Sequence, residues 1–205
     1  MTRRVAAAVL TPPVWIPPGQ DPRAWRVALA EDLLDVLALM AEVEPAVVVP
    51  AADLWLRSEV GWPGLPWYAA QSARLPDLVR AVAAAPAPAL GASPDQVALI
   101  AGDAPDLPGL VIAKLLRPLT TRPVAVAPAV DGAGLLGFAS RLPAPEWLPD
   151  AGLDDLDILA VRRAAPQLTD VVSTAGWHRL RRPEVLAGLD PRLEGWDATR
   201  ALLEA

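Results

Sequence analysis

The chain has 205 residues, of which 53% are hydrophobic, and carries a formal net charge of −6. This length predicts one domain with a substantial core, and the acidic balance argues against nonspecific binding to nucleic acid. The sequence contains no cysteine, which excludes disulfides, thiolate catalysis and cysteine-based metal sites.

The N-terminus is only superficially like a signal peptide. Its apolar run, residues 5–10, stops at Thr11 and is shorter than the usual hydrophobic region of such a peptide. No stretch approaches about 18 uninterrupted apolar residues, so no membrane span is expected. We therefore expect a soluble cytoplasmic protein.

In the N-terminal half, strands and helices are predicted to alternate. Apolar runs predict strands at 5–10, 46–49 and 67–70. Helices are expected at 22–43, 51–60 and 75–85, the first beginning with Asp21 as its N-cap and Pro22 in its first turn. Residues 86–94, rich in Ala, Pro and Gly, predict a surface loop.

The central segment, residues 96–137, has the pattern of a β-α-β unit. Two buried strands are predicted at 97–101 and 124–129, with a helix between them. Beyond this unit the pattern indicates strands at 135–139 and 168–173. Helices are predicted at 153–165, 183–189 and 196–203.

This alternation predicts an α/β fold in three layers, with a mostly parallel central sheet covered by helices on both faces. Residues 1–205 are expected to form a single domain. Ligands of open parallel sheets bind beyond the carboxyl ends of the strands. The turns after the two central strands are therefore the first place to look for a site.

The first of these turns contains Asp103 and Asp106. Carboxylates at a strand end can hold Mg²⁺ or Mn²⁺ against a substrate phosphate. The alternative is structural: Asp103 caps the following helix and Asp106 is a solvated turn residue.

The second turn contains Asp131, Gly132 and Gly134. Its glycines permit positive φ angles and close approach of the backbone to a ligand. An ordinary tight turn explains the same residues.

Two further features have competing interpretations. His178 is the only histidine and could act as a general base, but no nucleophile pattern accompanies it, so a structural or surface role is the simpler interpretation. The acids at 154, 155 and 157 are interpreted as the favourable negative start of a helix rather than as a metal cluster.

The run Gly102-Asp103-Ala104-Pro105-Asp106-Leu107, the later Asp131-Gly132 and the Leu135-Leu136-Gly137 that follows resemble the nucleotide-diphospho-sugar transferase-like proteins. This is a small bacterial group once catalogued as a domain of unknown function. It is related to the molybdenum-cofactor and phospholactate nucleotidyltransferases. Gln71, before a predicted helix, also matches.

The resemblance implies a Rossmann-like fold of the GT-A type that binds a nucleotide or nucleotide-sugar. It implies that Asp103 holds Mg²⁺ or Mn²⁺, assisted by Asp106, and that Asp103 and Asp131 are catalytic. The substrate-binding residues would include Gln71 and the glycines of the two turns, Gly102, Gly132 and Gly134.

The chain departs from this group in three places. The segment 11–26 lacks the usual basic loop, so that only Arg23 and Arg26 are expected to contact phosphate. Ala133 replaces the second glycine of the later turn. Arg181 and Arg182 stand where acidic residues are usual, which inverts the local charge.

The leading hypothesis is a metal-assisted glycosyltransferase that acts on a nucleotide-activated donor. The alternative is a GT-A-type protein that has lost catalysis and serves as a binding or scaffold protein. A nucleotidyltransferase related to the phospholactate guanylyltransferases has less support from the motifs. The sequence leaves a homodimer open.

Overall fold

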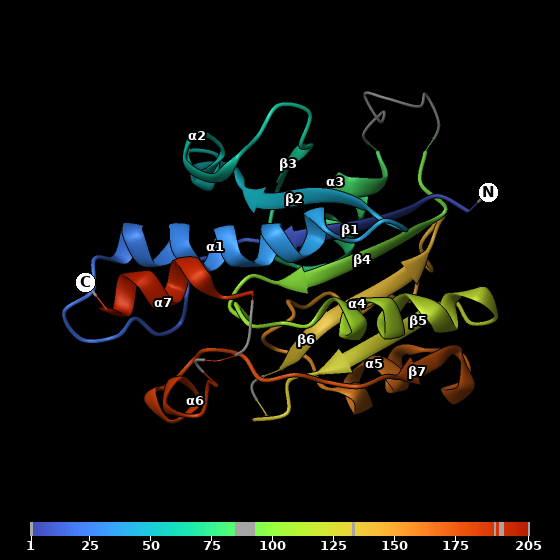
Figure 1. Cartoon of the computed structure of the whole chain (residues 1–205). Helices are drawn as coiled ribbons and strands as arrows, with labels where there is room; N and C mark the ends of the chain where they lie inside the picture. The colour runs from blue at the N-terminus through green and yellow to red at the C-terminus, as the bar shows by residue number, and fades with distance from the viewer. Residues whose placement is uncertain (1, 85–92, 133, 191, 193–194, 205) are drawn as a thin grey trace.

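A seven-stranded sheet forms the middle layer of the molecule (Figure 1). The computed structural model describes residues 2–84, 93–132, 134–190, 192 and 195–204. The strand order is β3-β2-β1-β4-β6-β5-β7. The strands are β1 (Arg4–Val9), β2 (Glu44–Pro50), β3 (Trp67–Ala70), β4 (Gln96–Ala101), β5 (Val124–Pro128), β6 (Leu135–Arg141) and β7 (Val171–Ser173).

Only β6 runs against its two neighbours, and the other paired strands are parallel. The α-helices are α1 (Pro22–Ala38), α2 (Leu56–Val60), α3 (Leu75–Ala83), α4 (Gly109–Leu116), α5 (Ile158–Ala164), α6 (Pro183–Ala187) and α7 (Asp197–Glu204). Short 3₁₀ turns lie at Ala51–Asp53, Arg117–Thr120 and Leu168–Asp170.

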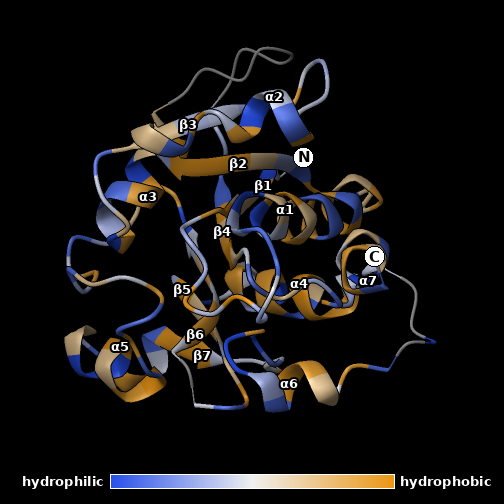
Figure 2. Ribbon diagram, turned by 90° about the vertical axis from the view of Figure 1, so that its left-hand side faces the viewer, coloured by the Kyte–Doolittle hydropathy of each residue, from blue (hydrophilic) through white to orange (hydrophobic). Residues whose placement is uncertain are grey.

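Helices cover both faces of the sheet. Figure 2 shows α1, α4 and α7 on one side and α3 and α5 on the other, with apolar strands between them. The prediction of an α/β fold in three layers with a mostly parallel sheet is confirmed. Of the helices that the structure describes, none is long and apolar enough to cross a membrane.

The strands are mostly apolar because alternate side chains pack into two cores, one on each face of the sheet. In β1, Ala6 and Ala8 pack with residues of α1 and α4, whereas Val5, Ala7 and Val9 pack with residues of α3 and α5. The same parity holds along β4, where Ala98 and Ile100 belong to the first core and Val97 and Leu99 to the second.

Several predicted elements have different bounds in the structure. The helix predicted at 51–60 is a 3₁₀ turn, Ala51–Asp53, followed by α2, and the strand predicted at 168–173 is a 3₁₀ turn, Leu168–Asp170, followed by β7. The helix predicted at 22–43 ends at Ala38, although its N-cap is Asp21 as expected. The helix predicted at 153–165 begins only at Ile158, because the Asp157 side chain caps it and accepts the N–H of Ala160 at 2.6 Å. The interpretation of Asp154 as part of a helix start is therefore wrong. The loop expected at 86–94 lies largely outside the described residues.

The C-terminal segment is held against α1. Asp32 of α1 is 2% exposed and accepts the backbone N–H groups of Ala198 at 2.8 Å and Thr199 at 2.9 Å, at the start of α7. Figure 1 shows α7 lying alongside α1. A third apolar cluster joins these parts; its buried members are Trp25, Leu29, Leu180, Leu189 and Trp196.

Asp32 gives this attachment a pH dependence. Burial raises its pKa from 3.8 to about 6, against the opposing effect of its hydrogen bonds with Thr199 and Ala198. A raised pKa means that the contribution of Asp32 to stability is present at low pH and is lost as the pH rises through about 6.

We expect the unfolding free energy of the wild type to fall by up to about 3 kcal/mol between pH 4 and pH 7 through this group. In Asp32→Asn this component disappears, as urea unfolding across the pH range can measure. Asp35→Asn, on the exposed face of the same helix, controls for the loss of a negative charge. An unchanged pH slope in Asp32→Asn would contradict the assignment.

Candidate functional site

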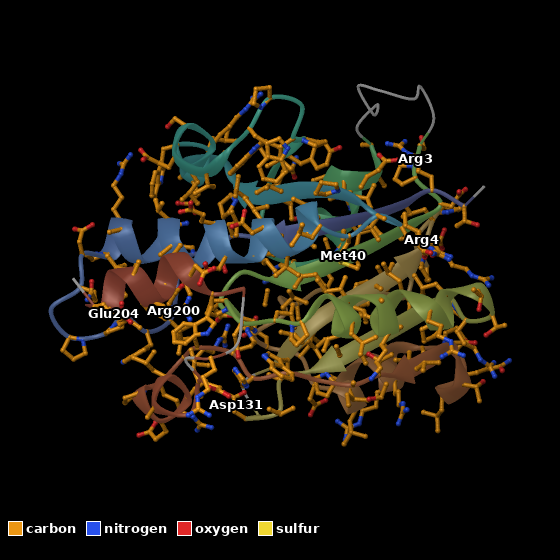
Figure 3. The ribbon with its side chains drawn as sticks, in the orientation of Figure 1. Arg3, Arg4, Met40, Asp131, Arg200 and Glu204 are labelled. Atoms are coloured by element: carbon orange, nitrogen blue, oxygen red, sulfur yellow. The ribbon has the colours of Figure 1, made fainter. Side chains whose placement is uncertain are left out.

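The carboxyl ends of β4 and β5 bring the predicted acidic turns to one edge of the sheet. Asp103 and Asp106 follow β4, and Asp131 follows β5. Figure 3 shows Asp131 at this edge, at the far end of the sheet from Arg3 and Arg4. Ligands of open α/β sheets bind beyond this edge.

The segment 176–182 crosses this edge and meets both turns. The backbone N–H of Val130 donates to the Trp177 carbonyl at 3.1 Å, and the N–H of Leu180 donates to the Asp103 carbonyl at 2.6 Å. The N–H of Arg181 donates to the Arg179 carbonyl at 2.9 Å, which closes a tight turn around the buried Leu180 and leaves Arg179 and Arg181 on either side of it.

Asp103 is paired with both of these arginines. Arg179 donates from Nε to Oδ1 at 2.5 Å and from Nη2 to Oδ2 at 3.0 Å. Arg181 donates from Nε to Oδ2 at 2.8 Å. The side chains of Asp103 and Arg179 are 8% and 3% exposed, so this is a buried, bidentate ion pair.

Asp154 links the same two arginines from the other side. Arg179 donates to its Oδ1 through Nη1 at 2.8 Å, and Arg181 donates to it through Nη2. Burial alone would raise the pKa of Asp154, but the charges of Arg179 and Arg181 outweigh burial and hold that pKa below its usual value. The pKa of Arg181 is raised, because the attraction of Asp103 and Asp154 exceeds the opposing effect of burial.

The four side chains thus form a cluster of two carboxylates and two guanidiniums, here called the Arg–Asp cluster: Asp103, Asp154, Arg179 and Arg181. A dication at Asp103 would lie beside both guanidiniums. Two unit charges about 4 Å apart repel by about 4 kcal/mol at an effective dielectric constant of 20, and a dication doubles this. Within the described ranges, no group of three or more His, Asp or Glu side chains could hold a metal ion. The arrangement therefore does not fit the predicted metal at Asp103 and Asp106.

Asp106 is also occupied by protein donors. It accepts the indole N–H of Trp177 at 3.1 Å, and Nε2 of His178 lies 2.9 Å from both of its oxygens. Since a carboxylate only accepts, the Nε2 atom of His178 carries a proton. Asp106 is buried, and the side-chain cap expected for α4 is absent at its N-cap, Pro108. The structural alternative, with Asp103 as helix cap and Asp106 solvated, is therefore wrong.

Asp131 has a different environment from the other acids. Its side chain is 7% exposed, yet among the described residues neither carboxylate oxygen has a hydrogen-bond partner. Arg182 approaches Oδ2 only to 3.9 Å and instead donates to the Asp131 carbonyl at 3.3 Å. A buried carboxylate without hydrogen bonds is costly and suits a site that a ligand completes.

Glycine is required at the positions of the two turns for different structural reasons. Gly132 and Gly134 have φ angles of +77° and +89°, and a Cβ on Gly134 would lie 2.5 Å from the Leu153 carbonyl oxygen. Gly102 is needed for packing, since a Cβ there would lie 2.9 Å from the Val9 carbonyl oxygen at the end of β1. The turn at Gly134 thereby fixes the loop that carries Asp154.

The two arginines predicted to contact phosphate are paired with other acids. Arg26 donates to Asp53 at 2.7 Å and lines a small cavity that Gly102 and Asp103 also line. Arg23 is paired with Glu59 at 2.7 Å and is 59% exposed on its side chain.

Gln71 is exposed and follows β3, which is three strand positions from β4. This places it roughly 14 Å from the Asp103 turn. The structure thus gathers Asp103, Asp106 and Asp131 at one edge, with Arg26 beside them. Gln71 lies at a distance from that group.

The sequence did not predict the Arg–Asp cluster. Arg181 was singled out, with Arg182, only as a place where acids are usual; Arg179 was not singled out, and Asp154 was assigned to the start of a helix. No local spacing marks these residues, because the two arginines lie 76 and 78 residues from Asp103 along the chain.

Neither a scan of protein-family models nor a search of curated proteins finds a match. Among solved structures, the fold matches a candidate nucleotide-diphospho-sugar transferase from Desulfovibrio desulfuricans G20 with a TM-score of 0.65 and 18% identity, over 100% of this chain and 98% of that one. It also matches Rv0371c of Mycobacterium tuberculosis H37Rv in complex with manganese, with a TM-score of 0.56 and 17% identity, over 100% and 99% of the two chains.

A third similar structure is glucosyl-3-phosphoglycerate synthase of Mycobacterium tuberculosis, in complex with Mn²⁺, UDP and glucosyl-3-phosphoglycerate. It has a TM-score of 0.56 and 18% identity, over 98% of this chain and 78% of the synthase. At these identities the likeness establishes the fold. The chain has the Rossmann-like fold of the nucleotide-diphospho-sugar transferases.

The buried ion pair of Asp103 and Arg179 leads to a prediction about the free energy of unfolding. Arg179→Met leaves Asp103 buried with one partner fewer, and we expect a loss of about 3–5 kcal/mol in urea unfolding. Replacing both partners, in Asp103→Leu with Arg179→Met, should recover most of that loss, because no buried charge is then left unpaired. Arg122→Met, at an exposed position, is the control. A loss below about 1 kcal/mol for Arg179→Met would contradict the pairing.

Proposed function

We propose that this chain binds a nucleotide-activated sugar at the carboxyl edge of its sheet and acts as a GT-A-type transferase. The observation that carries the proposal is the Asp131 carboxylate, which is buried beside the positive-φ glycine Gly132 and accepts no hydrogen bond from any residue that the structure describes. Sugar hydroxyl groups can donate hydrogen bonds to such a carboxylate. The fold shared with the nucleotide-diphospho-sugar transferases supports this ligand class.

In this proposal Asp131 binds a hydroxyl of the sugar or of the acceptor. If the hydroxyl belongs to the acceptor, Asp131 can also take its proton as the new bond to the sugar forms. The diphosphate leaving group develops negative charge, which requires positive charge held in place before the reaction. Of the two arginines paired with Asp103, Arg181 is the more exposed, with 12% of its side chain accessible against 3% for Arg179, and in this proposal it supplies that charge.

One observation favours a second candidate function, a binding or scaffold protein without catalysis. The cavity between Asp103 and the loop after β1 has a volume of only about 20 Å³. That is room for about one water molecule, whereas ligand pockets usually measure roughly 300–1,000 Å³. This cavity would have to open for a nucleotide to reach Asp103 from that side; a larger pocket, of about 520 Å³, is lined by Gly132, Gly134 and Asp154.

Replacement of Asp131 separates stability from function. Asp131→Asn removes a buried charge without hydrogen bonds, so we expect the ligand-free protein to gain about 1 kcal/mol of stability. The same change should weaken binding of the sugar nucleotide by tenfold or more, because a hydrogen-bonded charge is lost. Asp35→Asn, at an exposed position, should change neither quantity. If Asp131→Asn instead destabilises the free protein by several kcal/mol, the carboxylate has a structural role.

Thermal shift measurements test the function directly. The panel contains UDP-glucose, GDP-mannose, CMP-sialic acid, the corresponding nucleotides, and CTP and GTP. A ligand at 100 times its Kd stabilises the native state by about 2.7 kcal/mol. We expect stabilisation by a sugar nucleotide that exceeds the effect of its nucleotide alone in the wild type but not in Asp131→Asn. The absence of any shift across the panel would reject the transferase and leave the scaffold.

A further inference from the structure

The position that a divalent cation would need is filled from within the chain. Three charged N–H groups, two from Arg179 and one from Arg181, already donate to the two oxygens of Asp103, at 2.5, 3.0 and 2.8 Å. Mg²⁺ and Mn²⁺ bind carboxylate oxygens directly and require those oxygens to be accessible. Asp103 cannot serve both kinds of partner at once.

The two arginines also satisfy a second carboxylate. Asp154 accepts from Arg179 at 2.8 Å and from Arg181. Two guanidiniums therefore lie between two carboxylates, and the formal charges of the four groups cancel. A single divalent cation between Asp103 and Asp154 would balance the same charge.

The arginines cannot easily leave this position. Leu180, between them, is fully buried in the cluster with Trp25 and Leu29. The N–H of Leu180 donates to the Asp103 carbonyl, and Arg179 also donates to the Leu135 carbonyl at 3.0 Å. Movement of Arg179 would break these contacts as well as its ion pairs.

We infer that Arg179 and Arg181 replace the divalent cation in this chain, and that Asp103 and Asp154 form a latent metal site which the two guanidiniums block. The protein then binds its ligands without a divalent metal. This inference does not depend on the proposed function, because metal binding is measured without any nucleotide.

The test uses Mn²⁺ and the full chain, with binding followed by electron paramagnetic resonance and by calorimetry. We expect no saturable site in the wild type up to 1 mM Mn²⁺. This concentration is roughly the largest dissociation constant found for weak protein sites that bind divalent cations. In Arg179→Ser with Arg181→Ser, the two carboxylates are released, and we expect a single site at least tenfold tighter than any wild-type binding. Adding Asp154→Asn should abolish it. Arg122→Ser controls for the loss of positive charge elsewhere.

The outcomes separate clearly. Saturable binding of Mn²⁺ to the wild type that is lost in Asp103→Asn would overturn the inference, since the arginines would then not block the site. A folded double variant that binds no Mn²⁺ would overturn it too, because no latent site would exist. If the double variant does not fold, the wild-type titration and its Asp103→Asn control still decide whether the site is blocked.

The nucleotide experiment has an independent result. If a sugar nucleotide stabilises the wild type equally in EDTA and in Mn²⁺, both proposals stand. If stabilisation requires Mn²⁺, the inference that Arg179 and Arg181 replace the divalent cation is wrong, although the proposed ligand class is right. If no nucleotide binds while the Mn²⁺ titrations behave as expected, the proposed function fails and the inference about the metal site stands.

Discussion

The buried pair of Arg179 with Asp103 is the interaction on which the rest of the site depends. Taking both charges out of water is costly, and the cost is offset only where geometry and additional hydrogen bonds satisfy both groups. Here they do: the pair is bidentate, Arg181 adds a third donor to Asp103, and Asp154 accepts from both arginines. Leu180, between the two arginines, packs in the apolar cluster that contains Trp25 of α1. Asp32, also on α1, holds α7 against that helix. The C-terminal segment therefore folds as part of the site.

Charge balance distinguishes the four acids at this edge. Asp103 and Asp154 are neutralised within the Arg–Asp cluster, and Asp106 is held by Trp177 and His178. Asp131 keeps two buried oxygens without a hydrogen bond from the described part of the chain. A ligand that brings donor groups gains most at Asp131. One that brings a dication finds Asp103 already paired. Recognition of hydroxyl groups is thus better supported than metal coordination.

The fold was largely predictable from the sequence. Continuous apolar runs indicate strands that are buried on both faces of a sheet, and apolar residues at helical spacing indicate the helices that cover those faces. Val5–Val9 and Gln96–Ala101 were predictable for that reason. The start of α5 was not, because three acids within four positions can each serve as the cap, and the contact that selects Asp157 depends on local geometry. The site was predictable only in part. The carboxyl ends of β4 and β5, which lie on either side of β6, place Asp103 and Asp131 at one edge, but the partner of Asp103 lies 76 residues away in the chain. No periodicity connects such distant positions.

An anomalous difference map from crystals grown with Mn²⁺ tests the central claim most directly, since it locates the metal and the two arginines in one experiment. The account predicts guanidinium density of Arg179 and Arg181 against Asp103 and Asp154, and no anomalous peak within bonding distance of either carboxylate. A manganese peak bonded to Asp103, with Arg179 turned away from it, would contradict the account.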